Sequence, residues 1–139
     1  MEIYGEEIVI PTKGFSDIRD ITNSVGEVVV HSKIKNGLAN IFVIGSTASV
    51  STMEFEPALV EDMKDQLEKM ASRTMPTRHG QTWGDDNGFS HIRATFMGPG
   101  ITVPISNSRL ILGTWQQIVI IDHDNRPRER KIFVQVMGE

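Results

Sequence analysis

Short apolar segments alternate with turn residues through the last third of this 139-residue sequence, and this pattern constrains the fold most strongly. Apolar residues recur at every second position in 92–96 and 101–105, which is the period of a strand with one buried face. Glycine, proline, asparagine and serine at 98–100 and 107–108 indicate turns between strands. We predict five strands here: Ile92–Phe96, Ile101–Ile105, Leu110–Leu112 and a final hairpin of Gln116–Asp122 with Lys131–Met137.

Two helices and three further extended segments are predicted before this region. The first helix carries Val25, Val28 and Val29 on one face and ends at Gly37. The second begins at Pro57, a residue favoured in the first turn. Its apolar positions recur at helical spacing: Leu59, Met63, Leu67 and Met70. The extended segments are a short strand at 8–10 ended by Pro11, a buried strand at 38–44, and 46–52. The expected fold is α+β, an antiparallel β-sandwich with two helices, as one domain over residues 1–139.

Composition excludes several classes of protein. The chain has no cysteine, which excludes a disulfide scaffold, a thiolate nucleophile and Cys-ligated metal centres. Its net charge of −4 provides no general attraction for nucleic acid. The apolar run 118–121 is too short to cross a bilayer, and the N-terminus does not resemble a signal peptide, so we expect a cytoplasmic protein with no membrane partner. The basic run 126–131 is interpreted as a solvated hairpin rim, the alternative being a rim that steers phosphate.

The stretch 77–93 concentrates polar and ionisable side chains beside a predicted buried strand. Such groups cost folding free energy unless they are paired, and loops held by strands often carry binding groups. Its histidines, His79 and His91, are twelve residues apart, which matches no compact metal-ligand spacing. Structural hydrogen bonding, proton transfer and metal binding are therefore all open for them. His31 and His123 are expected to be ordinary surface residues.

The same stretch contains turn residues that could also bind a ligand. Asp85 and Asp86 precede an Asn-Gly pair, which is typical of a turn. The carboxylate of Asp86 could also hold a histidine or a divalent ion. Trp83 is either a core residue or one wall of a site for an aromatic ligand.

Two arginines and a small-residue segment indicate phosphate binding. Arg93 is expected on a strand face, where its planar guanidinium would match phosphate or pair with Glu54. Arg109 is a second candidate. The segment 45–49 offers hydroxyl groups and backbone amides, although it lacks the Gly-Lys-Ser/Thr ending of a P-loop. Its candidate binding residues are Ser46 and Thr47.

Several motifs together resemble the YjbQ-like family. The resemblance covers nearly the whole chain and is most specific in Leu-Gly-Thr-Trp-Gln-Gln at 112–117. Further matching segments are Asn87 to Thr95, Met97-Gly98-Pro99, Thr102 to Ile105, Gly45 to Ala48, Glu54 to Pro57 and the arginine-rich last hairpin.

The resemblance implies a compact β-sandwich with two helices, assembled as a homotrimer with sites near subunit boundaries. It also implies a weak secondary thiamine-phosphate synthase activity, which joins a pyrimidine diphosphate to a thiazole phosphate and releases pyrophosphate. Family members often have histidine where this chain has Phe89 and, at the start of another segment, Gly45. His79 and His91 are then the remaining histidines of the family type, with Glu54 or Asp86 to complete a site.

We therefore hypothesise a transferase site. His79, His91 and Glu54 are the candidate catalytic residues, and a divalent ion (magnesium or zinc) would be bound by His79, His91 and Asp86. The candidate substrate-binding residues are Arg93, Arg109, Trp83, Asn87, Ser46 and Thr47. The alternatives are a non-catalytic binding protein for a phosphorylated metabolite, a metal-dependent phosphate-ester hydrolase, and a purely structural trimer.

Overall fold

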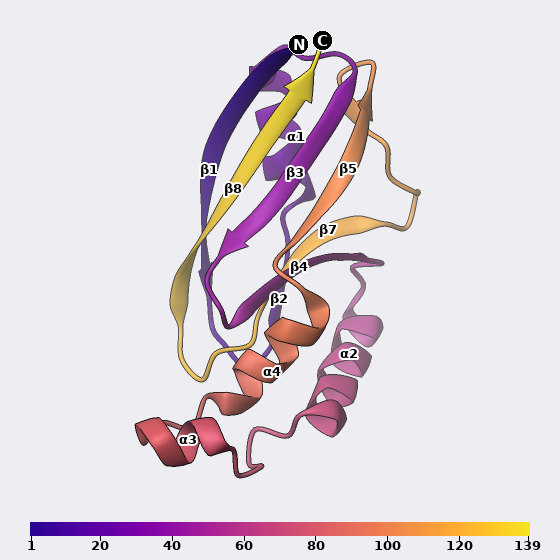
Figure 1. The fold of residues 1–139 in the computed structure, drawn as a ribbon. Helices are drawn as coiled ribbons and strands as arrows, with labels where there is room; N and C mark the ends of the chain where they lie inside the picture. Colours follow the sequence, from indigo (N-terminus) through magenta and orange to yellow (C-terminus); the bar gives the residue numbers. More distant parts are fainter.

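Eight strands form two antiparallel sheets in the structure, a computed structural model that describes residues 1–139 (Figure 1). The larger sheet has the order β1 (Glu2–Thr12), β8 (Arg128–Gly138), β3 (Gly37–Ile44), β5 (Gly100–Ser106) and β6 (Arg109–Leu110). The smaller sheet has the order β2 (Asp17–Asp20), β7 (Gln117–Asp122) and β4 (Ala48–Met53). Four helices accompany the sheets: α1 (Thr22–Ser32), α2 (Pro57–Met70), α3 (Arg78–Trp83) and α4 (Gly88–Met97).

The strand β7 lies between two layers of apolar side chains. Ile118 and Ile120 join the main core cluster together with residues of α1 and the larger sheet. Val119 and Ile121 point the other way and form a smaller cluster that packs against Met63 of α2 and other apolar residues. This alternation follows from the two-residue period of a strand, and it makes the smaller sheet the layer to which α2 attaches.

Several predictions from local pattern are confirmed. The helix that begins at Pro57 is α2, and its first turn is capped by the Glu56 carboxylate, which accepts from the amides of Ala58 and Leu59. The strands predicted at 38–44 and 101–105 are β3 and β5. The first strand is longer than predicted and continues through Pro11, because β1 is an edge strand where a missing amide donor is tolerated.

The protein contains more helix than its apolar periodicity predicts. The prediction of a strand at 92–96 is wrong, since these residues belong to α4. The prediction of two helices is also wrong, because α3 occupies part of the stretch expected to be a loop. The first helix ends at Ser32 rather than at Gly37, with Lys33 in the left-handed conformation at its C-terminus.

The predicted final hairpin is wrong in its pairing. β7 pairs with β2 and β4, whereas β8 pairs with β1 and β3 in the other sheet. The segment 123–127 therefore passes from one sheet to the other.

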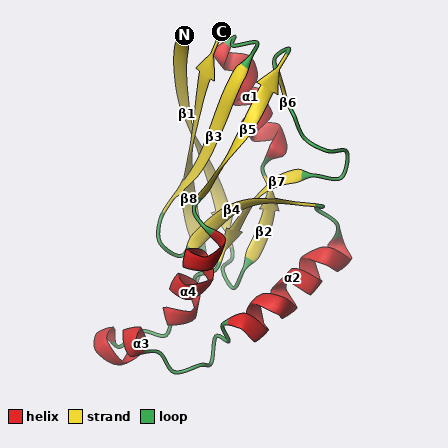
Figure 2. Cartoon of the chain, turned by 45° about the vertical axis from the view of Figure 1, so that its right-hand side comes forward, coloured by secondary structure: helices red, strands yellow, loops and turns green.

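The two chain ends and the helices α2, α3 and α4 lie at opposite ends of the molecule (Figure 1, Figure 2). Glu2 pairs with Gly138, which brings the termini together. None of the four helices has the length and apolar character needed to span a bilayer.

Candidate functional site

Two short helices bring the histidines of the polar stretch together. His79 lies on α3 and His91 on α4, and their ring centroids are 4.6 Å apart with the planes tilted by 53°. Asp85 Oδ1 lies 3.3 Å from His79 Nε2. The prediction that these two histidines belong to one site therefore has a geometric basis, although they are distant in the sequence.

Thr77 and Gly88 set the spacing between the two helices. The Thr77 hydroxyl accepts from the Gly80 amide at 2.9 Å and so begins α3. A Cβ atom at Gly88 would lie 2.2 Å from the Thr77 hydroxyl, so only glycine permits this contact. The close approach of the two helix starts places His79 beside His91.

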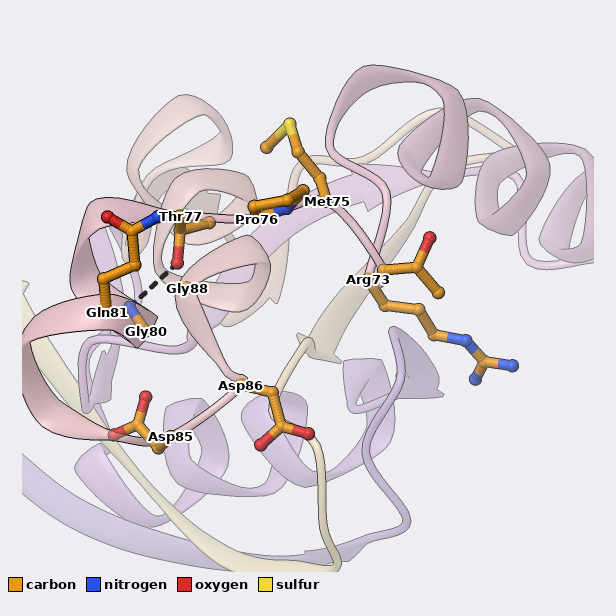
Figure 3. A pocket seen from close by; sticks show the side chains of 10 residues that line it. Arg73, Met75, Pro76, Thr77, Gly80, Gln81, Asp85, Asp86 and Gly88 are labelled. Carbon is orange, nitrogen blue, oxygen red and sulfur yellow. Dashed lines mark hydrogen bonds between the residues drawn. The ribbon is translucent and has the colours of Figure 1, made fainter.

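Three adjoining pockets surround the histidine pair. The middle pocket, of about 480 Å³, is lined by both histidines. It shares residues 75–77 and Gly88 with a pocket of about 460 Å³ on one side, shown in Figure 3. It shares His91 with a pocket of about 370 Å³ on the other side, which we call the basic pocket. The residues lining the basic pocket are Ile44, Gly45, Ser46, Thr47, Asn87, His91, Arg128, Glu129, Arg130 and Lys131.

The basic pocket gathers several residues that the sequence predicted for substrate binding. Ser46, Thr47 and Asn87 all line it, next to His91. Ser46 and Thr47 follow β3, and Asn87 lies at the start of α4. The fold therefore brings together residues that are about 40 positions apart in the sequence. Asn87 donates to Asp124 at 3.4 Å, and its Oδ1 is buried without a hydrogen-bond partner.

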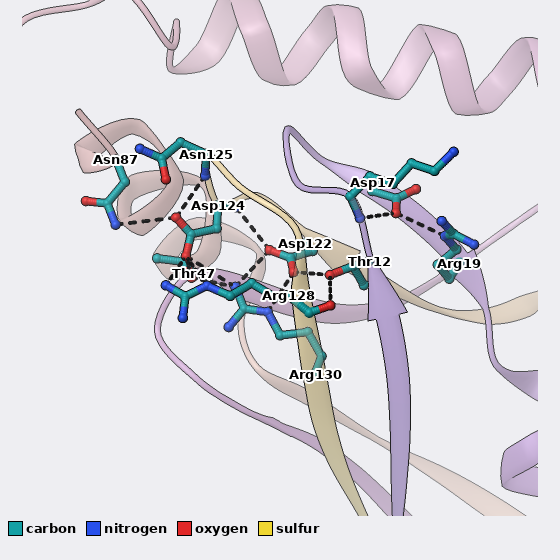
Figure 4. A network of polar contacts seen from close by, with 11 residues as sticks. Thr12, Asp17, Arg19, Thr47, Asn87, Asp122, Asp124, Asn125, Arg128 and Arg130 are labelled. Atoms are coloured by element: carbon teal, nitrogen blue, oxygen red, sulfur yellow. Dashed lines mark hydrogen bonds and ion pairs between the residues drawn. The ribbon is translucent and has the colours of Figure 1, made fainter. Parts of the chain in front are cut away.

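A buried network of ion pairs lies beneath the basic pocket (Figure 4). Arg130 donates to both carboxylate oxygens of Asp122 at 2.8 Å and to the Thr47 hydroxyl at 2.6 Å. Arg128 pairs with Asp124 at 2.7 Å, and Asp124 accepts a further hydrogen bond from Thr47. Bidentate pairing of this kind satisfies buried charges that would otherwise destabilise the fold.

The network also sets the charge of Asp124. Burial alone would raise the pKa of this carboxyl group, but the Asn125 amide and the Arg128 guanidinium hold the pKa below its ordinary value. Asp124 therefore remains an anion that fixes Arg128 at the pocket.

Arg128, Arg130 and Lys131 were not among the predicted site residues. Their interpretation as a solvated rim is wrong for Arg130, which is only 6% exposed and paired with Asp122. The signal was the basic run itself, for which phosphate steering was the less favoured alternative.

Arg93 lies in a different, buried environment. Its guanidinium donates to Glu68 at 2.7 Å, to the Ala71 carbonyl and to Ser16, and it stacks on the Phe89 ring. The predicted pairing with Glu54 is wrong, since Glu68 is the partner. With a side chain only 3% exposed, Arg93 holds α4 against α2 and the β1–β2 segment rather than facing a pocket.

The prediction that His123 lies on the surface is wrong, since this residue is fully buried. Its two ring nitrogens lie 2.7 Å from Ser16 Oγ and 3.0 Å from Ser49 Oγ. Burial, reinforced by the nearby charge of Arg93, lowers the pKa of His123 to about 3. The imidazole is therefore neutral at physiological pH. No local pattern distinguished it from a surface histidine, because its burial depends on two segments far away in the sequence.

The remaining predicted site residues do not join the histidine pair. Arg109 lines a separate groove against α1, and Glu54 is exposed between β4 and α2. Trp83, at the end of α3, is 73% exposed. Asp86 lines the pocket shown in Figure 3, together with Asp85, and neither histidine lines that pocket. No three side chains among histidine, aspartate and glutamate form a cluster that could hold a metal ion, so the proposed ligands His79, His91 and Asp86 do not form a complete set within one chain.

Comparison with known proteins gives consistent matches over the full chain. The UPF0047 protein YjbQ-like family matches residues 6–139. A UPF0047 protein of Methanothermobacter thermautotrophicus is 36% identical over 139 residues, covering all of this chain and 95% of the relative. A UPF0047 protein of Synechocystis is 33% identical, covering 98% of this chain and 92% of the relative.

Solved structures agree with this relationship. The crystal structure of a YbjQ-like protein of unknown function from Sulfolobus solfataricus is 34% identical, with a TM-score of 0.94 and 99% of both chains covered. A hypothetical protein from Aeropyrum pernix is 28% identical, with a TM-score of 0.90, covering 98% of this chain and 99% of that one. The chain therefore belongs to the UPF0047 family of YjbQ-like proteins.

Proposed function

We propose that the protein is a transferase of the thiamine-phosphate synthase type, which joins a pyrimidine diphosphate to a thiazole phosphate and releases pyrophosphate. The observation that carries the proposal is the histidine pair, which lies between pockets large enough for two substrate groups. His91 borders the basic pocket, so a proton donor adjoins cationic groups.

The proposed reaction requires help mainly for the leaving group. The thiazole nitrogen forms a bond to the methylene carbon of the pyrimidine, the carbon–oxygen bond breaks, and its electron pair leaves with pyrophosphate. The attacking nitrogen carries no proton and becomes cationic, so the reaction needs an acid for the leaving group rather than a base. His91 is the proposed acid, the His79 ring packs against it and is itself paired with Asp85, and basic side chains stabilise the departing charge.

A resident metal ion is not needed in this form of the proposal. The two histidines and Asp86 do not form a three-ligand cluster, so no step of the proposed reaction uses a protein-bound ion. Magnesium would instead enter with the diphosphate substrate, since this ion commonly binds through substrate phosphates.

The assembly, the location and the layering of the sheets are parts of the same proposal. A homotrimer is supported by exposed apolar side chains on β1, β3 and β8, such as Ile3, Phe42 and Phe133. A cytoplasmic location is consistent with the absence of cysteine. We treat the two sheets as the layers of a sandwich because both contribute to one core cluster.

A non-catalytic binding protein for a phosphorylated metabolite is the second candidate. The feature that favours it is the pairing of Arg128 and Arg130 with buried carboxylates, which makes a rigid pocket. A metal-dependent hydrolase receives less support, because it would need the complete ligand set discussed above.

A product assay for thiamine phosphate tests the proposal. It uses both precursors, magnesium and a large amount of protein of known metal content. We expect product with the wild type, at least about 100-fold less with His91→Ala, and unchanged product with His31→Ala, an exposed control on α1. Binding of either precursor without product, under enzyme excess, would favour the binding protein. Phosphate release from generic esters would favour the hydrolase.

A further inference from the structure

Arg130 is a nearly buried cation with one edge that has no partner. Its Nε and Nη2 atoms are engaged by Asp122, and Nη2 also donates to Thr47. These contacts hold the guanidinium in a single orientation on one side. No hydrogen bond or ion pair engages the two N–H groups of Nη1 on the other side.

The free edge of Arg130 is open to the basic pocket. The only buried side-chain nitrogen or oxygen without a hydrogen-bond partner in the chain is Asn87 Oδ1, so Arg130 Nη1 is not sealed inside the protein. A Cβ atom at Gly45 would lie 2.7 Å from this nitrogen. Gly45 also has φ of +151°, a conformation that favours glycine. The absent side chain at Gly45 therefore leaves room in front of the arginine.

Two more cations surround this opening. Arg128 binds Asp124 through Nε and Nη2, which leaves its Nη1 free. Lys131 also lines the pocket and has no ion pair. The carboxylates of Asp122 and Asp124 are fully buried behind the arginines, so they orient these side chains without occupying the pocket. Fixed N–H donors and a mobile ammonium group together suit a tetrahedral oxyanion.

We infer that the basic pocket is a phosphate subsite, with Arg130 Nη1 as its fixed donor and Arg128 and Lys131 as its outer cations. Its position next to His91 makes it the site for the diphosphate end of the ligand. The identity of the molecule that carries this diphosphate rests on the proposed function, but binding of the anion itself does not. Salt screens the attraction between the outer cations and a dianion, so binding should weaken as salt rises. Glu129, also in the lining, opposes binding with one negative charge.

The test measures binding of inorganic phosphate and pyrophosphate by calorimetry and by NMR of the arginine side-chain N–H groups. Removal of Arg130 would leave Asp122 buried without a partner and endanger folding, so two milder variants are used. Lys131→Gln removes a cation, and Gly45→Ala places a methyl group against Arg130 Nη1. Gly98→Ala is the matched control, since Gly98 also has a positive φ and a Cβ atom there meets nothing within 4 Å.

We expect saturable pyrophosphate binding that shifts the Arg130 resonance and weakens about tenfold in each site variant but not in the control. Melting curves verify that all three variants are folded. No binding of either anion, or binding that both site variants leave unchanged, overturns the subsite.

The subsite and the proposed reaction can fail separately. Anion binding with the expected variant pattern but without thiamine phosphate product would retain the subsite and reject the transferase. Full turnover in Lys131→Gln and Gly45→Ala would retain the transferase and reject the subsite.

Discussion

Individual ionisable residues inside this protein are held by specific partners. Asp122, Asp124 and His123 are fully buried, and Arg130 and Arg93 are nearly so. Each charged member of this set has an oppositely charged partner, while His123 is neutral and bonded to two serines. Removal of any one partner would leave a buried polar group without compensation, which is costly.

Substitution of Arg93 tests whether it supports the fold. We expect Arg93→Ala to lower the free energy of unfolding by about 3–5 kcal/mol, because the buried Ala71 carbonyl loses its donor and a cavity is left beside the Phe89 ring. Arg109→Ala, at an exposed position without an ion pair, should change it by less than about 0.5 kcal/mol. Urea unfolding measures both. Wild-type stability combined with lost turnover in Arg93→Ala would instead assign Arg93 to the ligand.

The pH dependence of stability tests the environment of His123. Its pKa falls from 6.5 to about 3 on folding, so the unfolded chain binds the proton more readily. The stabilisation is fully present above pH 6.5 and is lost as the pH falls toward 3. We expect a loss of about 2 kcal/mol in the free energy of unfolding between pH 7 and pH 5. His123→Gln should be less stable at pH 7 but should show a flatter profile. Identical slopes for the two proteins would contradict the assignment.

At the scale of elements, helix boundaries and helix faces depend on contacts beyond the local pattern. In α4 the buried side chains include Phe89, Arg93 and Ala94, which lie on one helical face. The same segment also fits a strand, since Ile92, Ala94 and Phe96 alternate. The structure settles this ambiguity, and Phe96 is 74% exposed.

The C-terminus of α1 provides a test at this scale. Lys33 has φ of 60°, a left-handed conformation that costs a residue with a Cβ atom about 1 kcal/mol. We therefore expect Lys33→Gly to raise the free energy of unfolding by about 0.5–1 kcal/mol, as determined by chemical denaturation. Lys35→Gly is the control, because Lys35 lacks this backbone strain and should gain nothing. Equal effects of the two substitutions would argue against a strained helix end.

At the scale of the whole molecule, the main hydrophobic core and the candidate site lie in different regions. The strands β3, β7 and β8 together supply nearly half of the main core cluster, whereas α3 has no buried residue. The histidine pair of the candidate site thus lies partly on a helix that contributes no side chain to the core.

Hydrogen exchange followed by mass spectrometry tests this division. Amides of β7 and β8 should exchange only through global unfolding, and those of α3 at least about 100-fold faster through local opening. Pyrophosphate should slow exchange near residues 45–47 and 87–91 while leaving α1 unchanged. Protection of α3 equal to that of β8 would show that this end is part of the cooperative core.

Part of the candidate site could be found from the sequence. The high density of polar residues at 77–93 identified His79, His91 and Asn87, and the hydroxyl-rich segment at 45–49 identified Ser46 and Thr47. The structure places all five around adjoining pockets. Arg109 and Glu54 matched the expected chemistry by residue type alone, and the fold places both elsewhere.

The sequence by itself determined the features that depend on neighbouring residues. A run of apolar and β-branched residues specifies β3, and alternating apolar positions between turns specify β5. Pro57 followed by helical spacing specifies α2, and all of these signals act within one element. Only the tertiary structure decided that β7 and β8 lie in different sheets, that Ser16 meets His123, and that Arg130 turns inward to Asp122. These outcomes depend on which segments share the core, and burial of charged groups is permitted only where that packing supplies partners.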